Sequence, residues 1–321
     1  MHDLLYLKII DGEPHKLHYF PQDIHSFPPR LRYLDHVVFK NRRRSADEVS
    51  QKLHFPQDIQ SLPPALRYLE WWNYPSKSLP SNFVPQIIVE LKMPHNKLKK
   101  LWTVVQNLGN LKHIDLRFSY RLTQIPDLSC APNLKKPWNF EHGRKHGTLS
   151  FDDCCGLKSL PTITGNIKYL KLGSTAVKEL PSSISSLENL ISLDLSNCEI
   201  EKLPNIKDLS RLIEIRISDC KNLQSLPELP LSLGLLDAHR CTPLRTVSDS
   251  ISRLVEGCWS DYQATPYNEF LFGNCSKLDQ TSRNQIMTQS QIRILRTTTI
   301  SVSQSEEMSR VSLSLLLFIS I

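Results

Sequence analysis

The chain has 321 residues, 40% of them hydrophobic, with 8 cysteines and a formal net charge of +7. An excess of 39 Lys and Arg over 32 Asp and Glu favours acidic surfaces as partners. It is too small to indicate a nucleic-acid-binding protein by itself, and Lys97, Lys99, Lys100, Arg121, Lys135 and Lys136 cluster in only two early turns, whereas a nucleic-acid role would need the charge gathered on one face.

The first 51 residues hold a partial internal duplication. Residues 20–34 (FPQDIHSFPPRLRYL) and 55–69 (FPQDIQSLPPALRYL) agree at 12 of 15 positions. The second copy leads into the sequence that follows, whereas the first has no such continuation. We therefore expect residues 1–51 to be an irregular N-terminal segment, without a signal peptide because Asp3 and other charges interrupt its start. The run Arg42–Arg44 is interpreted as a solvated linker, with a nuclear-targeting signal as the alternative.

From residue 52 to residue 247 one apolar frame recurs, with apolar residues at its first, fourth and sixth positions. Successive frames are separated by 22, 23, 23, 33, 23, 22 and 21 residues. This spacing is typical of leucine-rich repeats, and the alternation within each frame indicates a strand. We predict an α/β-type solenoid, a leucine-rich-repeat coil with a concave parallel β-sheet and an irregular or short helical convex side. The frames begin at Leu66, Ile88, Leu111, Leu134, Ile167, Leu190, Leu212 and Leu233.

The ninth position of the frame holds a small residue with a polar or weakly polar tip. Such a residue suits a turn in which a buried backbone group needs a partner. The cysteines at this position are expected to behave as small buried hydrophobes. Stacked turns are close enough for disulfides, so geometry leaves that alternative open, but reduced thiols in the cytoplasm or nucleus are favoured. The residues concerned are Asn96, Ser119, Cys154, Thr175, Cys198, Cys220 and Cys241.

The repeat pattern breaks near residues 134–148. Pro137 stands where the frame requires an apolar residue, and a polar segment follows it. A loop or a damaged repeat explains this break. His142 and His146 are four residues apart, as in a helical zinc pair, but the neighbouring glycines disfavour a helix and no third ligand is evident. We expect no metal.

No catalytic motif is present. The sequence has no phosphate-binding glycine loop, no H-E-x-x-H and no G-x-S-x-G. We expect neither enzymatic activity nor a cofactor.

The frame instead predicts a recognition surface. Side chains at positions three, five and seven of each strand are expected to project from the concave face, away from the core. Tyr169, Arg117 and Arg216 are the expected hot spots, because aromatic and Arg side chains dominate binding energy. For any one residue the alternative is a merely solvated strand position. The candidate binding residues are Glu90, Lys92, His113, Asp115, Arg117, Tyr169, Lys171, Ser192, Asp194, Glu214, Arg216, Leu235, Asp237 and His239.

Several segments resemble a known family. The stretches IIVELKMPHNKLKKLW (87–102) and NLKHIDLRFSYRLTQIPDLSCAPNLKK (110–136) resemble the repeats of plant intracellular immune receptors with a Toll/interleukin-receptor-type domain, a nucleotide-binding switch and leucine-rich repeats. The resemblance implies that the NAD-cleaving domain and the switch would lie before residue 1. It also implies that residues 248–287, which include FLFGNCSKLDQTSRNQIM (270–287), begin a truncated post-repeat domain, followed by an irregular tail at 288–321.

This resemblance implies a protein-protein interaction module that senses a ligand and makes autoinhibitory contacts in plant defence. Its partners would be a pathogen effector or other receptor domains, with no nucleic acid. The apolar end of the tail is shorter than the roughly 20 residues that a membrane helix needs, so no membrane span is expected. A stand-alone repeat adaptor or decoy, or a non-functional gene fragment, is the alternative.

Overall fold

The computed structural model forms two compact units, Met1–Ile167 and Lys168–Ile321. Each unit is a stack of coil turns in which one short strand per turn joins a parallel sheet. The predicted parallel-sheet solenoid with little helix is therefore confirmed. The structure describes residues 6–11, 33–39, 62, 66–74, 76–81, 83–102, 108–128, 131, 147–249, 251, 269–288 and 290–291.

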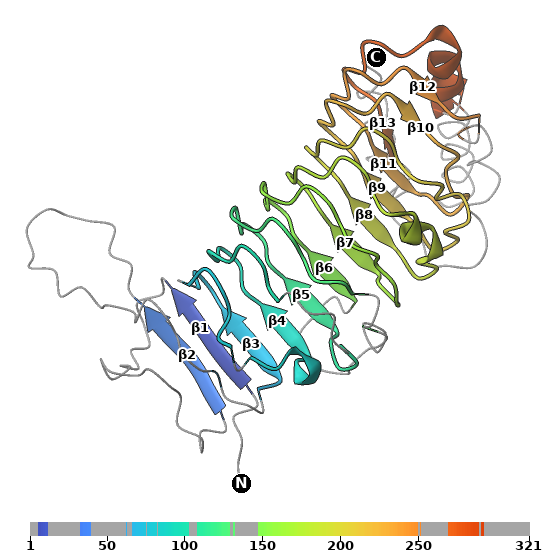
Figure 1. Ribbon diagram of the computed structural model, residues 1–321. Helices are drawn as coiled ribbons and strands as arrows, with labels where there is room; N and C mark the ends of the chain where they lie inside the picture. Colours follow the sequence, from blue (N-terminus) through green and yellow to red (C-terminus); the bar gives the residue numbers. More distant parts are fainter. Residues whose placement is uncertain are drawn as a thin grey trace, which may run out of the picture. The chain divides into compact units, whose positions relative to one another are not determined.

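In the first unit, the strands lie side by side in the order β6-β5-β4-β3-β1-β2, all parallel (Figure 1). In β4 the buried Leu91 lies between the half-buried Glu90 and Lys92, whereas in β5 and β6 neighbouring positions are buried as well. The elements are β1 (Tyr6–Asp11), β2 (Tyr33–Phe39), β3 (Tyr68–Trp71), η1 (Pro85–Ile87), β4 (Glu90–Lys92), β5 (His113–Asp115) and β6 (Thr148–Ser150).

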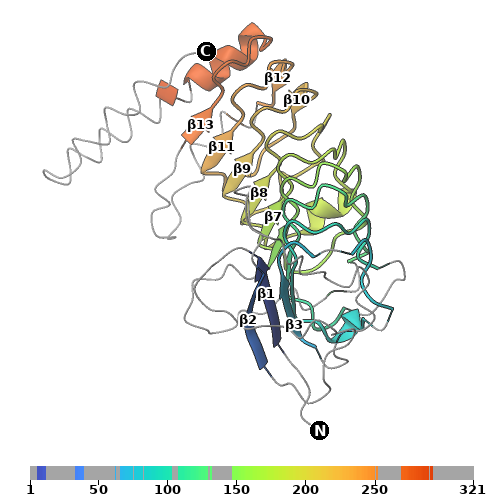
Figure 2. The same cartoon turned by 90° about the vertical axis from the view of Figure 1, so that its left-hand side faces the viewer.

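In the second unit, the strands follow the order β13-β11-β9-β8-β7, and β10 and β12 form a separate pair. Figure 2 shows β10 and β12 set apart from β9 and β11, on the returning side of each turn. The elements are β7 (Tyr169–Lys171), η2 (Ser182–Ser186), β8 (Ser192–Asp194), β9 (Glu214–Arg216), β10 (Ser225–Leu226), β11 (Leu235–Asp237), β12 (Thr246–Val247) and β13 (Glu269–Leu271).

Each turn leaves its strand through one residue in the left-handed backbone conformation, with φ between 57° and 63°. None of these residues is a glycine. Asn and Asp tolerate this conformation better than other side chains, but His95, Phe118 and Arg240 also adopt it. The full set is Asn73, His95, Phe118, Asp153, Ser174, Asn197, Asp219, Arg240 and Asn274. We call these nine residues and their immediate neighbours the rim of the coil.

The ninth-position residues that follow the rim are buried and reach the backbone, as predicted. The Cys154 thiol donates to the Leu116 carbonyl of the preceding turn at 3.2 Å, and Cys241 donates to Ile217 at 2.9 Å. The thiols of Cys198, Cys220 and Cys275 each donate in the same way to a backbone carbonyl of the preceding turn. The described cysteines are free thiols. Ser119 is an exception, because within the described residues its buried hydroxyl has no hydrogen-bond partner.

The coil continues across the break near Pro137. Ile114 in β5 is in register with Leu149 in β6, and the Leu116 amide donates to the Ser150 carbonyl at 2.9 Å. The break therefore adds residues to a connection and leaves the strand ladder intact. Pro137 itself, the pair His142 and His146, and the run Arg42–Arg44 lie outside the described residues.

Residues 1–51 contain more regular structure than we expected. β1 lies between β3 and β2, with Tyr6 in register with both Tyr33 and Tyr68. The two duplicated segments thus supply equivalent strands to the two edges of β1. The physical reason is the unpaired edge of β3, whose backbone groups gain partners when another strand adds to it.

Residues 269–288 also extend the coil, instead of only beginning another domain. Phe270 in β13 is in register with Leu236 in β11, and the helical residues 280–288 follow. The Ser282 hydroxyl accepts the Val247 amide at 2.9 Å, which ties this helix to the preceding turn. Among the described helices, none has the length and hydropathy to cross a bilayer.

Candidate functional site

The predicted binding residues fall into two groups, one on each unit. In the first unit, Glu90 and Lys92 lie in β4, His113 and Asp115 lie in β5, and Arg117 follows β5. The others lie in β7, β8, β9 and β11 of the second unit, except His239, which follows β11. Each group occupies the strand positions that alternate with fully buried residues, so its members share one face of their sheet. We call this the strand face of each unit.

Charge alternates from strand to strand along the fifth position of the frame. In the second unit Lys171 is in register with Asp194, and Asp194 with Arg216. Arg216 is in turn in register with Asp237. Because neighbouring strands are about 4.8 Å apart, each charge has an opposite charge beside it. The row is therefore nearly neutral as a whole, although it is polar at every step.

A similar alternation runs through the first unit. Glu70 is in register with Lys92, and Lys92 with Asp115. The strand faces of both units thus present a pattern of charge and carry little net charge. Such a surface discriminates partners by complementarity of position more than by overall attraction.

Acidic and basic side chains also pair along single strands. Lys92 Nζ lies 2.8 Å from Glu90 Oε2, and Arg216 Nε donates to Glu214 Oε1 at 2.6 Å. Arg117 binds Asp115 through two hydrogen bonds of 2.9 Å, and this contact raises the pKa of Arg117 further. These contacts hold long side chains in fixed positions before any partner binds, which lowers the entropic cost of binding.

Three of the predicted aspartates also stabilise the turn at the end of their strand. Asp115, Asp194 and Asp237 each accept the backbone N–H two residues later, at 3.2, 3.0 and 3.3 Å. Asp237 also contacts the imidazole of His239. Asp115 is buried, and Asp194 and Asp237 are half-buried. These carboxylates are already bound within the chain, so fewer of their oxygen lone pairs are available to a partner.

The remaining candidates differ in availability. Ser192 is buried, whereas Tyr169 and Leu235 are half-buried. Lys171 makes no ion pair within the part of the chain that the structure describes. Tyr169 and Lys171 both belong to β7, and they give this strand the aromatic and cationic groups that commonly anchor interfaces.

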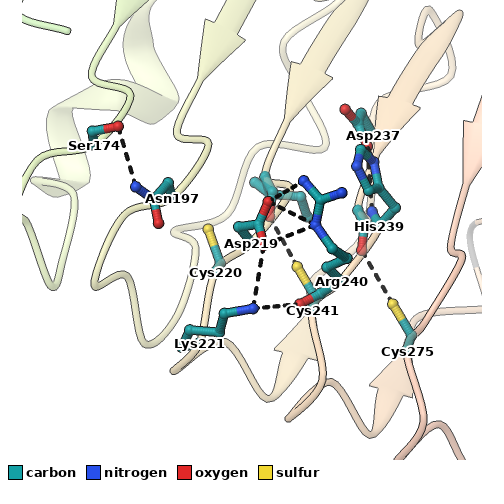
Figure 3. A network of polar contacts seen from close by, with 12 residues as sticks. Ser174, Asn197, Asp219, Cys220, Lys221, Asp237, His239, Arg240, Cys241 and Cys275 are labelled. Atoms are coloured by element: carbon teal, nitrogen blue, oxygen red, sulfur yellow. Dashed lines mark hydrogen bonds and ion pairs between the residues drawn. The ribbon is translucent and has the colours of Figure 1, made fainter. Parts of the chain in front are cut away.

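The rim of the second unit carries polar contacts that the frame did not predict. Figure 3 shows Arg240 reaching back one turn to Asp219, with 3.0 Å from Nε to each carboxylate oxygen. Lys221 Nζ donates to the same carboxylate at 3.2 Å. These hydrogen bonds, that of Arg240 first, lower the pKa of Asp219 to about 2. The sequence contained a signal for this contact, because Asp219 and Arg240 carry opposite charges at the same position of successive repeats.

The described part of the chain contains buried thiols of low reactivity. Within the described residues, no group of three His, Cys, Asp or Glu side chains is arranged to hold a metal ion. Burial raises the pKa of the Cys154 and Cys275 thiols to about 12, so both are poor nucleophiles at neutral pH. The faces are suited to contact with another molecule.

Comparison with known proteins finds leucine-rich repeats and plant disease resistance proteins. A Leucine Rich Repeat family model matches residues 89–106. The chain is 32% identical over 275 residues to Disease resistance protein RML1B of Arabidopsis thaliana, covering 69% of this chain and 26% of that protein. It is 37% identical over 290 residues to Disease resistance protein RPS6 of the same plant, covering 65% and 26%.

The chain therefore spans about a quarter of the length of these relatives. Among solved structures, it is similar to the leucine-rich repeat domain of the type III effector XopL, at 22% identity and a TM-score of 0.46. That match covers 66% of this chain and 69% of the other.

Proposed function

Since this chain is a leucine-rich-repeat protein related in sequence to plant disease resistance proteins, we propose that it binds a protein ligand in plant immunity. The strand faces are the proposed binding surface. The observation that carries this proposal is the alternating, preformed row of charges from Lys171 through Asp194 and Arg216 to Asp237. No reaction is proposed for the chain.

The second unit is the better candidate for the main contact. Tyr169 supplies an aromatic anchor, and the Arg216 guanidinium is exposed although Glu214 holds it in place. Such anchors contribute most when a rim of weaker contacts excludes water around them. The finer role that we propose is ligand sensing together with autoinhibitory contacts to other domains of an immune receptor. This role draws on the relatives' names and on the resemblance described above.

The proposal can be tested by proximity labelling in leaf cells with the full chain. A strand-face variant, Tyr169→Ala with Arg216→Ala, is compared with a control, Lys202→Ala with Glu228→Ala, whose residues lie outside the strands of this face. We expect the strand-face variant to lose a set of labelled proteins that the wild type and the control retain. Identical sets for all three chains would contradict the proposal. Thermal unfolding of each purified variant checks that the fold persists.

The same experiment separates the two roles. If the proteins that the strand-face variant no longer labels include a nucleotide-binding receptor chain, the result supports an autoinhibitory contact. A set that contains a foreign protein and no such chain supports ligand sensing.

A further inference from the structure

Most of the net charge of the protein lies in three turns of the first unit. Residues 71–126 contain 8 Lys and Arg against Glu90 and Asp115, so their net charge is 8 − 2 = +6 of the chain's +7. Both acids are already paired, with Lys92 and Arg117.

Five of these cations are exposed and make no ion pair within the described residues. Lys77 and Lys99 lie on adjacent turns, since the Lys99 amide donates to the Lys77 carbonyl at 3.2 Å. Lys97 similarly follows Tyr74 of the turn before it, with 3.2 Å from its amide to the Tyr74 carbonyl. The five are Lys77, Lys97, Lys99, Lys100 and Arg121.

The equivalent positions in the second unit are neutralised. Lys178 pairs with Glu201 of the next turn at 3.6 Å, and Lys202 pairs with Glu179 at 3.3 Å. The backbone of neighbouring turns pairs in the same way in both units. Glu179 forms a parallel β-bridge with Lys202, and Lys100 forms one with Gln124. The first unit therefore lacks acids where the fold has room for them.

Beside these cations, the rim of the first unit is aromatic. The His95 and Phe118 rings stack with centroids 4.5 Å apart and planes 10° apart, and Trp72 lies 6.3 Å from His95. All three side chains are half-buried, and Tyr120 is 58% exposed. The second unit has Ser174, Asn197, Asp219 and Arg240 at the matching left-handed positions.

Phe118 occupies this rim at a conformational cost. It has φ 61°, a backbone conformation that is unfavourable for a bulky side chain. Asn fits the same position at Asn73, Asn197 and Asn274. Strained residues of this kind persist mainly where they serve a function.

We infer that this basic aromatic rim (Trp72, His95, Lys97, Phe118, Tyr120 and Arg121) is a second docking surface, whose partner is an acidic protein segment with apolar side chains. The inference rests on the proposed protein-binding function but concerns a different surface. Its charge is complementary to carboxylates, in contrast to the balanced strand faces. It ends at Asp152 and Asp153 of the next turn, which are acidic.

The stacking favours a carboxylate partner over single-stranded nucleic acid. Nucleic-acid bases bind by stacking on free ring faces. The His95 ring is stacked on the Phe118 ring at 4.5 Å, so the facing sides of these two rings are closed to a base. The exposed cations beside them attract carboxylates.

The test uses the full chain and a fluorescein-labelled peptide in which glutamate alternates with phenylalanine, followed by fluorescence anisotropy. A glutamine-phenylalanine peptide and single-stranded oligo-dT are the comparison probes. Two variants remove the surface: Lys97→Glu with Arg121→Glu, and His95→Asn with Phe118→Asn. The matched charge control is Lys207→Glu with Lys277→Glu in the second unit, where both lysines are exposed.

We expect the wild type and the charge control to bind the glutamate peptide, and each rim variant to bind it at least about tenfold more weakly. Rim variants that bind as the wild type does, no binding by the wild type, or tighter rim-dependent binding of oligo-dT would each overturn the inference. The Asn variants place a residue that the chain already uses at this position, so they are expected to fold.

The strand-face variant, Tyr169→Ala with Arg216→Ala, is expected to keep its affinity for the glutamate peptide. Failure of the strand-face proposal and failure of this inference are therefore seen in separate variants and separate assays.

Discussion

At the scale of single residues, the aspartates of the strand faces separate structural from recognition roles. Asp194 accepts the Ser196 amide at 3.0 Å, and Asp194→Ala leaves that amide without its partner. We expect the free energy of unfolding to fall by about 1 kcal/mol. Asp194→Asn keeps the accepting oxygen and is expected to be close to the wild type. Urea denaturation measures both, and an Ala variant as stable as the Asn variant would rule out the structural role.

The buried thiols make stability depend on alkaline pH. Burial raises the pKa of Cys154 and Cys275 from 9.0 to about 12 in the folded state. The unfolded chain therefore loses these protons first, so the contribution to stability is complete below pH 9 and is lost as the pH rises toward about 12. We expect urea midpoints to fall over this range. Because lysines titrate there too, the control is Cys154→Ala with Cys275→Ala, whose midpoints must fall less steeply.

Sequence periodicity located the strand-face residues because a strand alternates strictly, so one buried leucine fixes where its neighbours point. The rim could not be located in this way. Its left-handed position accepts residues as different as Asp219, Phe118 and Arg240, and no composition rule unites them. The ion pair of Asp219 with Arg240 and the stacking of His95 on Phe118 depend on which turns are neighbours in space.

At the scale of secondary-structure elements, the break near Pro137 tests what holds the coil together. β5 and β6 pair directly, so the residues between them are a connection whose length matters little to the ladder. We expect deletion of residues 138–145 to change the free energy of unfolding by no more than about 1 kcal/mol, since loop closure depends only weakly on length. Circular dichroism during urea unfolding measures this. Loss of cooperative unfolding would show that the connection is part of the fold.

A single methyl group in the same turn is expected to do more harm. A Cβ at Gly156 would lie 2.8 Å from the Leu122 carbonyl oxygen and 3.0 Å from that of Tyr120. Both contacts are with backbone of the preceding turn, which cannot move without disturbing the stack. Gly156→Ala is therefore expected to lower the free energy of unfolding by about 1–3 kcal/mol in the same assay. A Gly156→Ala chain as stable as the wild type would contradict this tight approach of the two turns.

The elements outside the repeat frame were the hardest to predict. β1 and β2 belong to no leucine frame, and their pairing comes from the open edge of β3. The recurrence of Tyr-Leu at Tyr6, Tyr33 and Tyr68, which the structure aligns in register, was the available signal. β13 was equally hidden, because residue 269 lies 34 residues after the start of β11 at Leu235, beyond the usual frame.

At the scale of the whole molecule, a solenoid has no single centre, because each turn contacts only its neighbours. Leu193 in β8 is fully buried, and Leu193→Ala is expected to cost about 2–5 kcal/mol. Hydrogen exchange followed by mass spectrometry should show faster exchange in β7, β8 and β9 and little change in β4. Leu231→Ala, at a residue that is 52% exposed, is the control. Equal loss of protection in every strand would mean that the chain unfolds as one unit.

The absence of glycine from the nine rim positions has a consequence for how this protein can diversify. Nine turns each place a side chain at a point where many repeat folds could use a bare backbone. Every such turn consequently displays two independent sets of side chains, one on the strand and one on the rim. Because the two sets occupy different positions of the turn, a lineage of such proteins can alter the rim residues while keeping the strand residues, and so change one specificity while preserving the other.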